Sequence, residues 1–247
     1  MFDVISDIHG CFHELCDLME KLGHRKEEFG GTHILSSGRQ IVLVGDVVDR
    51  GPDPITCAVW ARAMVENGSA LWVLGNHDQK FMRWSKGNKV KVSHGLDRTI
   101  AQVQDLGIDA KDLGAFIGSL PHHLVLDGGK LVVVHAAWRD DFFGRDTSKG
   151  EARSWCLYGP TTGKTLENGL PDRIDWAGQR QVTEESPWIV YGHQPYPEPH
   201  LMNRTAGIDT GCVFGGKLTA LRWPEMEIVS VDARKQYSEH PVVREGD

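Results

Sequence analysis

The first third of the chain alternates short apolar runs with amphipathic segments, and this alternation restricts the fold more than any other feature. Apolar runs at 2–6, 41–44 and 70–74 have the length of strands, and the run at 41–44 has the unbroken hydrophobicity of a strand covered on both faces. Between them, residues 15–22 and 53–68 carry the spacing and the end signals of helices. Strand, helix, strand, helix, strand in this order predicts a parallel sheet with right-handed crossovers.

From about residue 124 the pattern changes to closely spaced strands. Two β-rich runs flank Asp127-Gly128-Gly129, a sequence typical of a β-hairpin turn. Further strand-like runs at 188–191, 217–222 and 227–231 are separated by Gly, Pro or Asn. The two halves together predict an α/β fold in which two mixed β-sheets face each other and are flanked by helices.

The chain carries no low-complexity linker and no internal repeat, so we expect a single domain over residues 1–247. The segment from about 139 to 181 is long and polar, and we expect it to form a lid or cap near the site. The tail after about residue 233 is polar and is expected to be loosely ordered.

Polar residues follow directly after each of five apolar runs. In α/β proteins the carboxyl ends of the strands face the ligand crevice, so we expect these side chains to meet at one place. Taken singly, each is explained by a turn, a helix cap or a satisfied polar residue, but five independent coincidences at the same topological position argue against that explanation. The residues are Asp7, His9, Asp46, Asn76, His135 and His193.

This set of side chains has the chemistry of a metal site. Three imidazoles and two carboxylates cannot share a buried pocket without a compensating cation. Six ligands exceed the four of a structural zinc site, which favours two ions about 3.5–4 Å apart with a carboxylate between them. Mixed oxygen and nitrogen ligands favour manganese, iron or zinc over calcium. Such a pair of ions is suited to in-line attack at phosphorus.

Composition excludes several classes of protein. The formal charge of −7 over 247 residues argues against a general nucleic-acid binder and suits a protein that holds cations. The five cysteines form no CxxC pair and are odd in number, which fits a reducing compartment. The first residues lack a signal-peptide pattern, and no apolar run approaches the roughly 18 residues of a membrane span. We therefore expect a cytoplasmic protein without a membrane partner.

The polar motifs resemble, in the same order, those of the calcineurin-like metallophosphoesterases. DxH stands at 7–9, GDxxDRG at 45–51, GNH[DE] at 75–78, a later His at 135 and GH at 192–193. The DRG element is typical of the phosphoprotein-phosphatase branch. Longer stretches are similar to bacterial bis(5′-nucleosyl)-tetraphosphatases and to the phosphatase module of bacterial polynucleotide kinase-phosphatase. The resemblance covers roughly residues 1–232 and implies an αββα sandwich.

The resemblance also implies a cofactor, two divalent metal ions. Manganese is the first choice, with iron, zinc or nickel as alternatives. Carried over by position, Asp7, His9 and His193 would hold one ion. Asn76 and His135 would hold the other, and Asp46 would bridge the two.

Three further residues receive catalytic roles from the resemblance. His77 would stay free of metal and protonate the leaving oxygen. Asp49 would hold His77 in position, and Arg50 would bind the non-bridging phosphate oxygens, for which a planar guanidinium is well suited.

The activity that the resemblance implies is hydrolysis of phosphate ester or phosphoanhydride bonds by a metal-bound hydroxide, with a histidine as general acid. The expected substrate is a phosphorylated small molecule or nucleotide such as diadenosine tetraphosphate. The alternatives are a Ser/Thr or Tyr phosphoprotein phosphatase and an RNA-end phosphatase. A binding scaffold that had lost catalysis should lack ligands or the acid, and none is missing here.

Two positions depart from the family pattern, and two features stay open. Ala137 stands where the family usually has glycine, so a positive φ there would strain the loop. Pro160 replaces an acidic residue, which affects the expected substrate contacts of the loop at 157–163. Residues 79–91 hold five basic residues and no acidic one, which suits either a polyphosphate tail or a solvated face. His94 could approach the site or serve as a cap.

Overall fold

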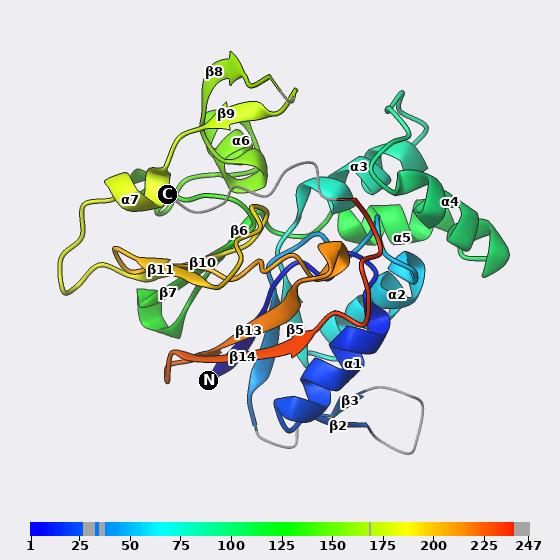
Figure 1. Cartoon of the computed structure of the whole chain (residues 1–247), viewed down its shortest axis with the longest axis horizontal. Helices are drawn as coiled ribbons and strands as arrows, with labels where there is room; N and C mark the ends of the chain where they lie inside the picture. The colour runs from blue at the N-terminus through cyan, green and yellow to red at the C-terminus, as the bar shows by residue number, and fades with distance from the viewer. Residues whose placement is uncertain (27–32, 35–37, 168, 240–247) are drawn as a thin grey trace.

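The computed structural model describes residues 1–26, 33–34, 38–167 and 169–239, and its centre is formed by two five-stranded sheets (Figure 1). The first sheet has the order β14-β13-β1-β4-β5. β1, β4 and β5 run parallel; β13 pairs antiparallel with β1, and β14 pairs antiparallel with β13 at the edge of the sheet. These strands are β1 (Phe2–Ile5), β4 (Gln40–Leu43), β5 (Ala70–Trp72), β13 (Lys217–Trp223) and β14 (Glu227–Asp232).

The second sheet has the order β11-β12-β10-β7-β6. β7, β10 and β12 run parallel, whereas β6 and β11 are antiparallel edge strands. The predicted hairpin is confirmed as the pair β6 and β7, joined by the short helix η1 (Asp127–Gly129). These strands are β6 (His123–Leu126), β7 (Leu131–Val134), β10 (Trp188–Tyr191), β11 (His200–Met202) and β12 (Thr205–Gly207).

Alternate residues of the central strands enter different layers, as the two-residue period of a strand requires. Val42 of β4 and Val133 of β7 lie in the buried cluster between the sheets. Ile41 and Leu43, the neighbours of Val42 in β4, instead join the core beneath the helices of the first sheet. On the other side, Val132 packs with side chains that cover the outer face of the second sheet. The unbroken apolar runs in the sequence are explained by this double burial.

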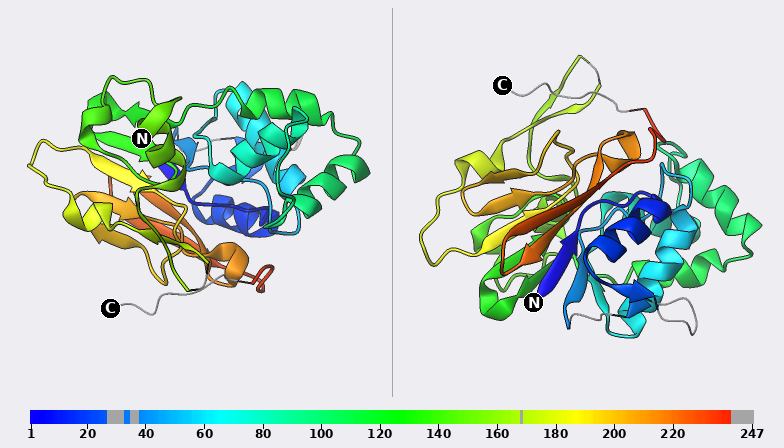
Figure 2. Two further views of the ribbon diagram at one scale, coloured as in Figure 1. Left: turned by 90° about the horizontal axis from the view of Figure 1, so that it is seen from above. Right: turned by 60° about the horizontal axis from the view of Figure 1, so that its bottom comes forward.

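Helices cover both outer faces, which confirms the predicted αββα layers. α1 (Phe12–Lys21) and α2 (Pro54–Glu66) pack against the first sheet, with the second sheet on its opposite side (Figure 2). α3 (Asn76–Ser85), α4 (Leu96–Asp105) and α5 (Ala110–Ile117) extend this helical layer beside α2. A separate cluster around α6 (Gly150–Tyr158) covers the second sheet. Short pairs β2 (Arg25–Lys26) with β3 (His33–Ile34) and β8 (Thr161–Thr165) with β9 (Pro171–Arg173) lie outside the main sheets.

The polar segment at 139–181 contains η2 (Asp140–Phe142), α6, the hairpin β8–β9 and α7 (Trp176–Gln179). It is therefore a structured insertion between β7 and β10. The start of the tail is held rather than loose, because Tyr237 donates from its hydroxyl to Glu14 at 2.7 Å and from its backbone to Val213 at 3.0 Å. Residues 240–247 of the expected tail lie outside the described residues.

Candidate metal centre and active site

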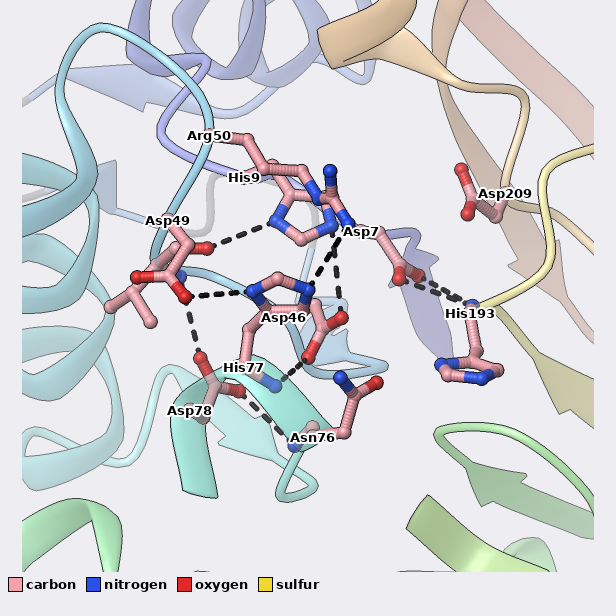
Figure 3. A network of polar contacts seen from close by, with 12 residues as sticks. Asp7, His9, Asp46, Asp49, Arg50, Asn76, His77, Asp78, His193 and Asp209 are labelled. Atoms are coloured by element: carbon pink, nitrogen blue, oxygen red, sulfur yellow. Dashed lines mark hydrogen bonds and ion pairs between the residues drawn. The ribbon is translucent and has the colours of Figure 1, made fainter. Parts of the chain in front are cut away.

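The six predicted metal ligands meet where the carboxyl ends of strands from the two sheets come together, and all of them except His135 are labelled in Figure 3. Three strands of the first sheet, β1, β4 and β5, and two of the second, β7 and β10, end here. The sequence predicted that the strands all end at one edge of a crevice. In the structure, the ends of parallel strands from two different sheets face each other across that crevice. The residues are Asp7, His9, Asp46, Asn76, His135 and His193.

Backbone carbonyls fix the orientation of two imidazoles. Nδ1 of His9 lies 2.9 Å from the carbonyl oxygen of Val48, and Nδ1 of His135 lies 3.0 Å from that of Val44. Each Nδ1 therefore carries the proton and donates it, which leaves the lone pair on Nε2. Both Nε2 atoms face the same carboxylate oxygen of Asp46, at 3.6 Å from His9 and 3.5 Å from His135. Asp46 is thus placed between the two imidazoles, as a bridging ligand has to be.

His193 lies with His135 and not with His9. Its Nδ1 is 3.1 Å from Nε2 of His135, and that same Nε2 is 3.0 Å from Oδ1 of Asn76. Ligand atoms of Asp46, His135 and His193 lie within 4.8 Å of one another. Only the backbone N–H of His193 reaches Asp7, at 3.1 Å. The His193 imidazole therefore lies beside Asn76 and His135, and not beside Asp7 and His9 with which the sequence analysis grouped it.

Buried negative charge is concentrated around these ligands. Asp7, Asp46 and Asp209 are almost fully buried. Burial raises the pKa of Asp46 to about 8, and burial with repulsion from Asp209 and Asp46 raises the pKa of Asp7 well above its ordinary value. Buried carboxylates that repel one another need a cation to stay ionised. The donor set of carboxylate oxygens, an amide oxygen and oriented imidazoles therefore fits divalent metal ions.

The loops that carry the ligands are strained. His9, Asp46 and Arg50 have φ values of 45°, 49° and 66°, the left-handed region that residues other than glycine rarely adopt. Gly75 allows the loop after β5 to approach, because a Cβ there would lie 2.2 Å from the backbone nitrogen of Asp46. Such strain persists only where the surroundings determine the backbone closely.

Asp78 is the residue that holds these loops together. Its Oδ1 accepts from the backbone nitrogens of Val47 at 3.0 Å and Val48 at 3.3 Å. Its Oδ2 accepts from Gly75 at 3.1 Å and from the indole of Trp72 at 3.3 Å. Asp78 is the last residue of the GNHD motif, and its role was not indicated by the sequence. Its burial and its four donors make it the clamp between the loops after β4 and β5.

His77 is oriented by a chain of hydrogen bonds. Its Nδ1 lies 2.7 Å from Oδ2 of Asp49, and the other oxygen of Asp49 accepts from the hydroxyl of Thr99 at 2.6 Å. Burial lowers the pKa of His77 well below 6.5 and raises that of Asp49 to about 7. The predicted contact between Asp49 and His77 is thus present. Thr99, on α4, is a further member that no sequence motif indicated.

Two arginines border the ligand cluster. Nη2 of Arg50 lies 3.4 Å from Nε2 of His77, and its guanidinium stacks over the ring of Phe214 at 5.3 Å. Arg173 comes from β9, in the segment at 139–181, and its Nη2 lies 2.8 Å from Nε2 of His193. Arg173 could not be predicted from the sequence, because it belongs to no motif with fixed spacing.

The two departures from the family pattern are accommodated. Ala137 is fully buried and is not among the residues with positive φ, so its methyl group causes no backbone strain. Pro160 accepts from the backbone nitrogen of Ile174 at 3.1 Å and follows Gly159, whose φ is 70°. His94 is exposed, and its ring centroid lies 6.5 Å from that of His77, so it borders the site.

Comparison with known proteins agrees with this geometry. The family model of calcineurin-like phosphoesterases matches residues 1–229. The chain belongs to the calcineurin-like phosphoesterase family. Its members hydrolyse phosphoesters at a binuclear metal centre, so the chain is a metallophosphoesterase and a hydrolase.

Individual relatives show how far the similarity extends. The phosphoesterase is 41% identical over 243 residues to the bis(5′-nucleosyl)-tetraphosphatase PrpE of Bacillus subtilis strain 168, covering 96% of this chain and 97% of the relative. A solved candidate diadenosine tetraphosphatase matches with a TM-score of 0.64 at 23% identity, covering 94% of this chain and 93% of the other. A serine/threonine phosphatase from Saccharomyces cerevisiae matches with a TM-score of 0.61 at 14% identity, over 97% and 81% of the chains. The two structural matches show the fold.

No helix among the described residues is long and apolar enough to cross a membrane.

The buried carboxylates generate a prediction for the metal-free phosphoesterase. Burial raises the folded-state pKa of Asp46 to about 8 and those of Asp49 and Asp78 to about 7, above the unfolded value of 3.8. Between about pH 7.5 and 9 the folded state therefore binds more protons than the unfolded state, so stability falls as the pH rises. The histidines do not oppose this, because their lowered pKa values keep them neutral in the folded state and unfolded histidine is largely neutral in this range.

Thermal unfolding in excess chelator, measured in steps across this range, should show a Tm that decreases with pH. Saturating manganese should largely abolish the decrease, because bound cations stabilise the ionised carboxylates. A metal-free Tm that rises across the range would contradict the electrostatic description of the cluster.

Proposed function

We propose that this phosphoesterase hydrolyses a phosphoanhydride bond of a dinucleoside tetraphosphate. Its cofactor would be two divalent metal ions, with manganese as the first choice. The observation that carries the chemistry is the placement of His77, Asp49 and Arg50 beside the ligand cluster, because it joins a proton donor and a phosphate-binding cation at one metal centre. The substrate class is supported by the 41% identity to the tetraphosphatase PrpE over nearly both chains.

The metal roles follow the geometry. Asp7 and His9 would hold one ion, Asn76, His135 and His193 the other, and Asp46 would bridge them. When bound, the two cations would activate water as the nucleophile and offset the charge on the phosphoryl oxygens.

Arg50 would hold the scissile phosphate. Its guanidinium is half-buried, stacks on Phe214 and lies 3.4 Å from His77, so it is already oriented before substrate binds. A planar donor of this kind forms strong charge-assisted hydrogen bonds with two phosphate oxygens. Arg173, which lies at His193 on the opposite border of the cluster, would reach another oxygen of the same phosphate.

His77 would donate the proton to the leaving oxygen. Burial and the positive charge of Arg50 lower its pKa in the free protein. A bound phosphate cancels the charge of Arg50 and adds negative charge beside Nε2, which favours the imidazolium. Asp49 stabilises that imidazolium through Nδ1, and Thr99 keeps the carboxylate of Asp49 in place.

A panel of substrates tests the proposed function. With manganese, diadenosine tetraphosphate should have a higher kcat/KM than a phosphopeptide or 3′-phosphorylated RNA, measured by product chromatography.

Asp46→Asn should lower kcat/KM by about a hundredfold or more, because an amide bridges two cations poorly. Metal content of the purified variant should fall as well. Faster turnover of the phosphopeptide would make the protein a phosphoprotein phosphatase instead, and full activity in excess chelator would exclude the metal mechanism.

The role of His77 generates a prediction about leaving groups. Removing a positioned acid costs about 10²–10⁴-fold where the leaving oxygen is a poor one, and little where it leaves as nitrophenolate. His77→Ala should therefore abolish most hydrolysis of a sugar phosphate while largely sparing nitrophenyl phosphate. Asp49→Asn should show the same selectivity more weakly.

The measurement is the ratio of variant to unmodified kcat/KM for the two substrates at saturating manganese. His13→Ala, a substitution of an exposed histidine on α1, serves as the matched control and should change neither ratio. Equal losses on both substrates would make His77 a metal ligand or a positioning residue.

A further inference from the structure

A second pocket adjoins the metal centre along α3. Its volume is about 300 Å³, and its lining includes Asn76, Gln79, Arg83, Lys89, Lys91 and Tyr158. Asn76 belongs to both places, because its Oδ1 also lies 3.0 Å from Nε2 of His135 in the ligand cluster. A molecule bound at the metal centre can therefore continue past Asn76 into this pocket.

The pocket is strongly cationic in a chain whose formal charge is −7. Four basic side chains line it, namely Lys80, Arg83, Lys89 and Lys91, and no acidic side chain does. The carboxylates of the ligand cluster lie outside this lining, and Asn76 is the residue that belongs to both places. The acidic ligand cluster therefore suits cations, and the adjoining basic pocket suits an anion.

The pocket also contains a buried donor that has no partner. The side chain of Gln79 is 2% exposed, and its Oε1 accepts from the hydroxyl of Tyr158 at 2.8 Å. Its Nε2 is buried and makes no hydrogen bond to any residue that the structure describes. A buried amide nitrogen left in this way costs free energy unless a bound group accepts from it.

The walls of the pocket are held in place before any ligand binds. Lys80 donates to the backbone oxygen of Ser93 at 2.6 Å and to its hydroxyl at 3.2 Å. Val90 packs against the main core, which anchors the loop between Lys89 and Lys91. Tyr158 reaches the pocket from the segment at 139–181, and its bond to Gln79 links that segment to α3.

We propose that this pocket binds the distal phosphates of a polyphosphate chain whose scissile phosphate lies at the metal centre. The inference rests on the proposed function and extends it, because it assigns a binding site to the part of the substrate that is not cleaved. Arg83, Lys89 and Lys91 would pair with the phosphate oxygens, and Nε2 of Gln79 would donate to one of them. The pocket would thus favour a polyphosphate over a monophosphate ester.

The test compares the double variant Lys89→Ala/Lys91→Ala with Lys86→Ala. Lys86 belongs to the same basic stretch but does not line the pocket, so it controls for net charge near α3. The double variant should raise KM for diadenosine tetraphosphate about tenfold and leave kcat/KM for nitrophenyl phosphate within about twofold, because only the longer substrate reaches the lysines. Inorganic tripolyphosphate, used as an inhibitor of nitrophenyl phosphate hydrolysis, should bind about tenfold more weakly to the double variant. Lys86→Ala should match the unmodified protein in all three measurements.

The outcomes separate the two proposals. If the unmodified protein does not hydrolyse diadenosine tetraphosphate, the proposed substrate is wrong, and the tripolyphosphate inhibition still decides whether the pocket binds polyphosphate. If it does hydrolyse the tetraphosphate but the double variant keeps the same KM and the same inhibition constant, the pocket is not the polyphosphate site. Equal losses on both substrates, or the same effect in Lys86→Ala, would show a general electrostatic effect and would also overturn the inference.

Discussion

Repulsion among buried carboxylates is the constraint on which the rest of this phosphoesterase depends. Asp7, Asp46 and Asp209 are buried together, and burial raises the pKa of each. A fold without cations would place such groups on the surface. The chain instead aims imidazoles at the same space and fixes them through Val48 and Val44, so the arrangement is complete only with metal ions. The residues that are most costly to bury are the ones the fold holds most firmly.

The two-sheet architecture explains how so many ligands can reach one place. A single parallel sheet delivers side chains along one edge, whereas here two parallel edges face each other across the site. β1, β4 and β5 bring Asp7, Asp46 and Asn76, and β7 and β10 bring His135 and His193. The cost is local strain in the connecting loops, which the clamp formed by Asp78 offsets by accepting four hydrogen bonds from the loops and from Trp72.

Chemistry and substrate choice are divided between different parts of the molecule. The ligand cluster lies on the rigid strand ends, where sub-ångström geometry can be kept. The side chains that we propose as substrate contacts lie around it, on α3 and on the segment at 139–181, which contributes Tyr158 and Arg173. This division is consistent with one family fold being found in proteins with several different phosphatase names.

The sequence by itself determined most strands of the two main sheets, the helices α1 and α2, and the residues that meet at the centre. A doubly buried strand must be apolar, and its end must be polar where a ligand lies. The contact between His77 and Asp49 was implied by the resemblance to the phosphoesterase motifs, and the structure contains it. Only the tertiary structure decided which imidazoles lie together, since His193 and His135 meet at the ends of β10 and β7, which are far apart in the chain but neighbours in the second sheet. It alone placed Thr99, Arg173 and Asp78, because their contacts join segments with no constant separation along the chain. The local sequence pattern determines which side chains stand at the end of a strand, but the distances between side chains from different elements depend on how the layers pack.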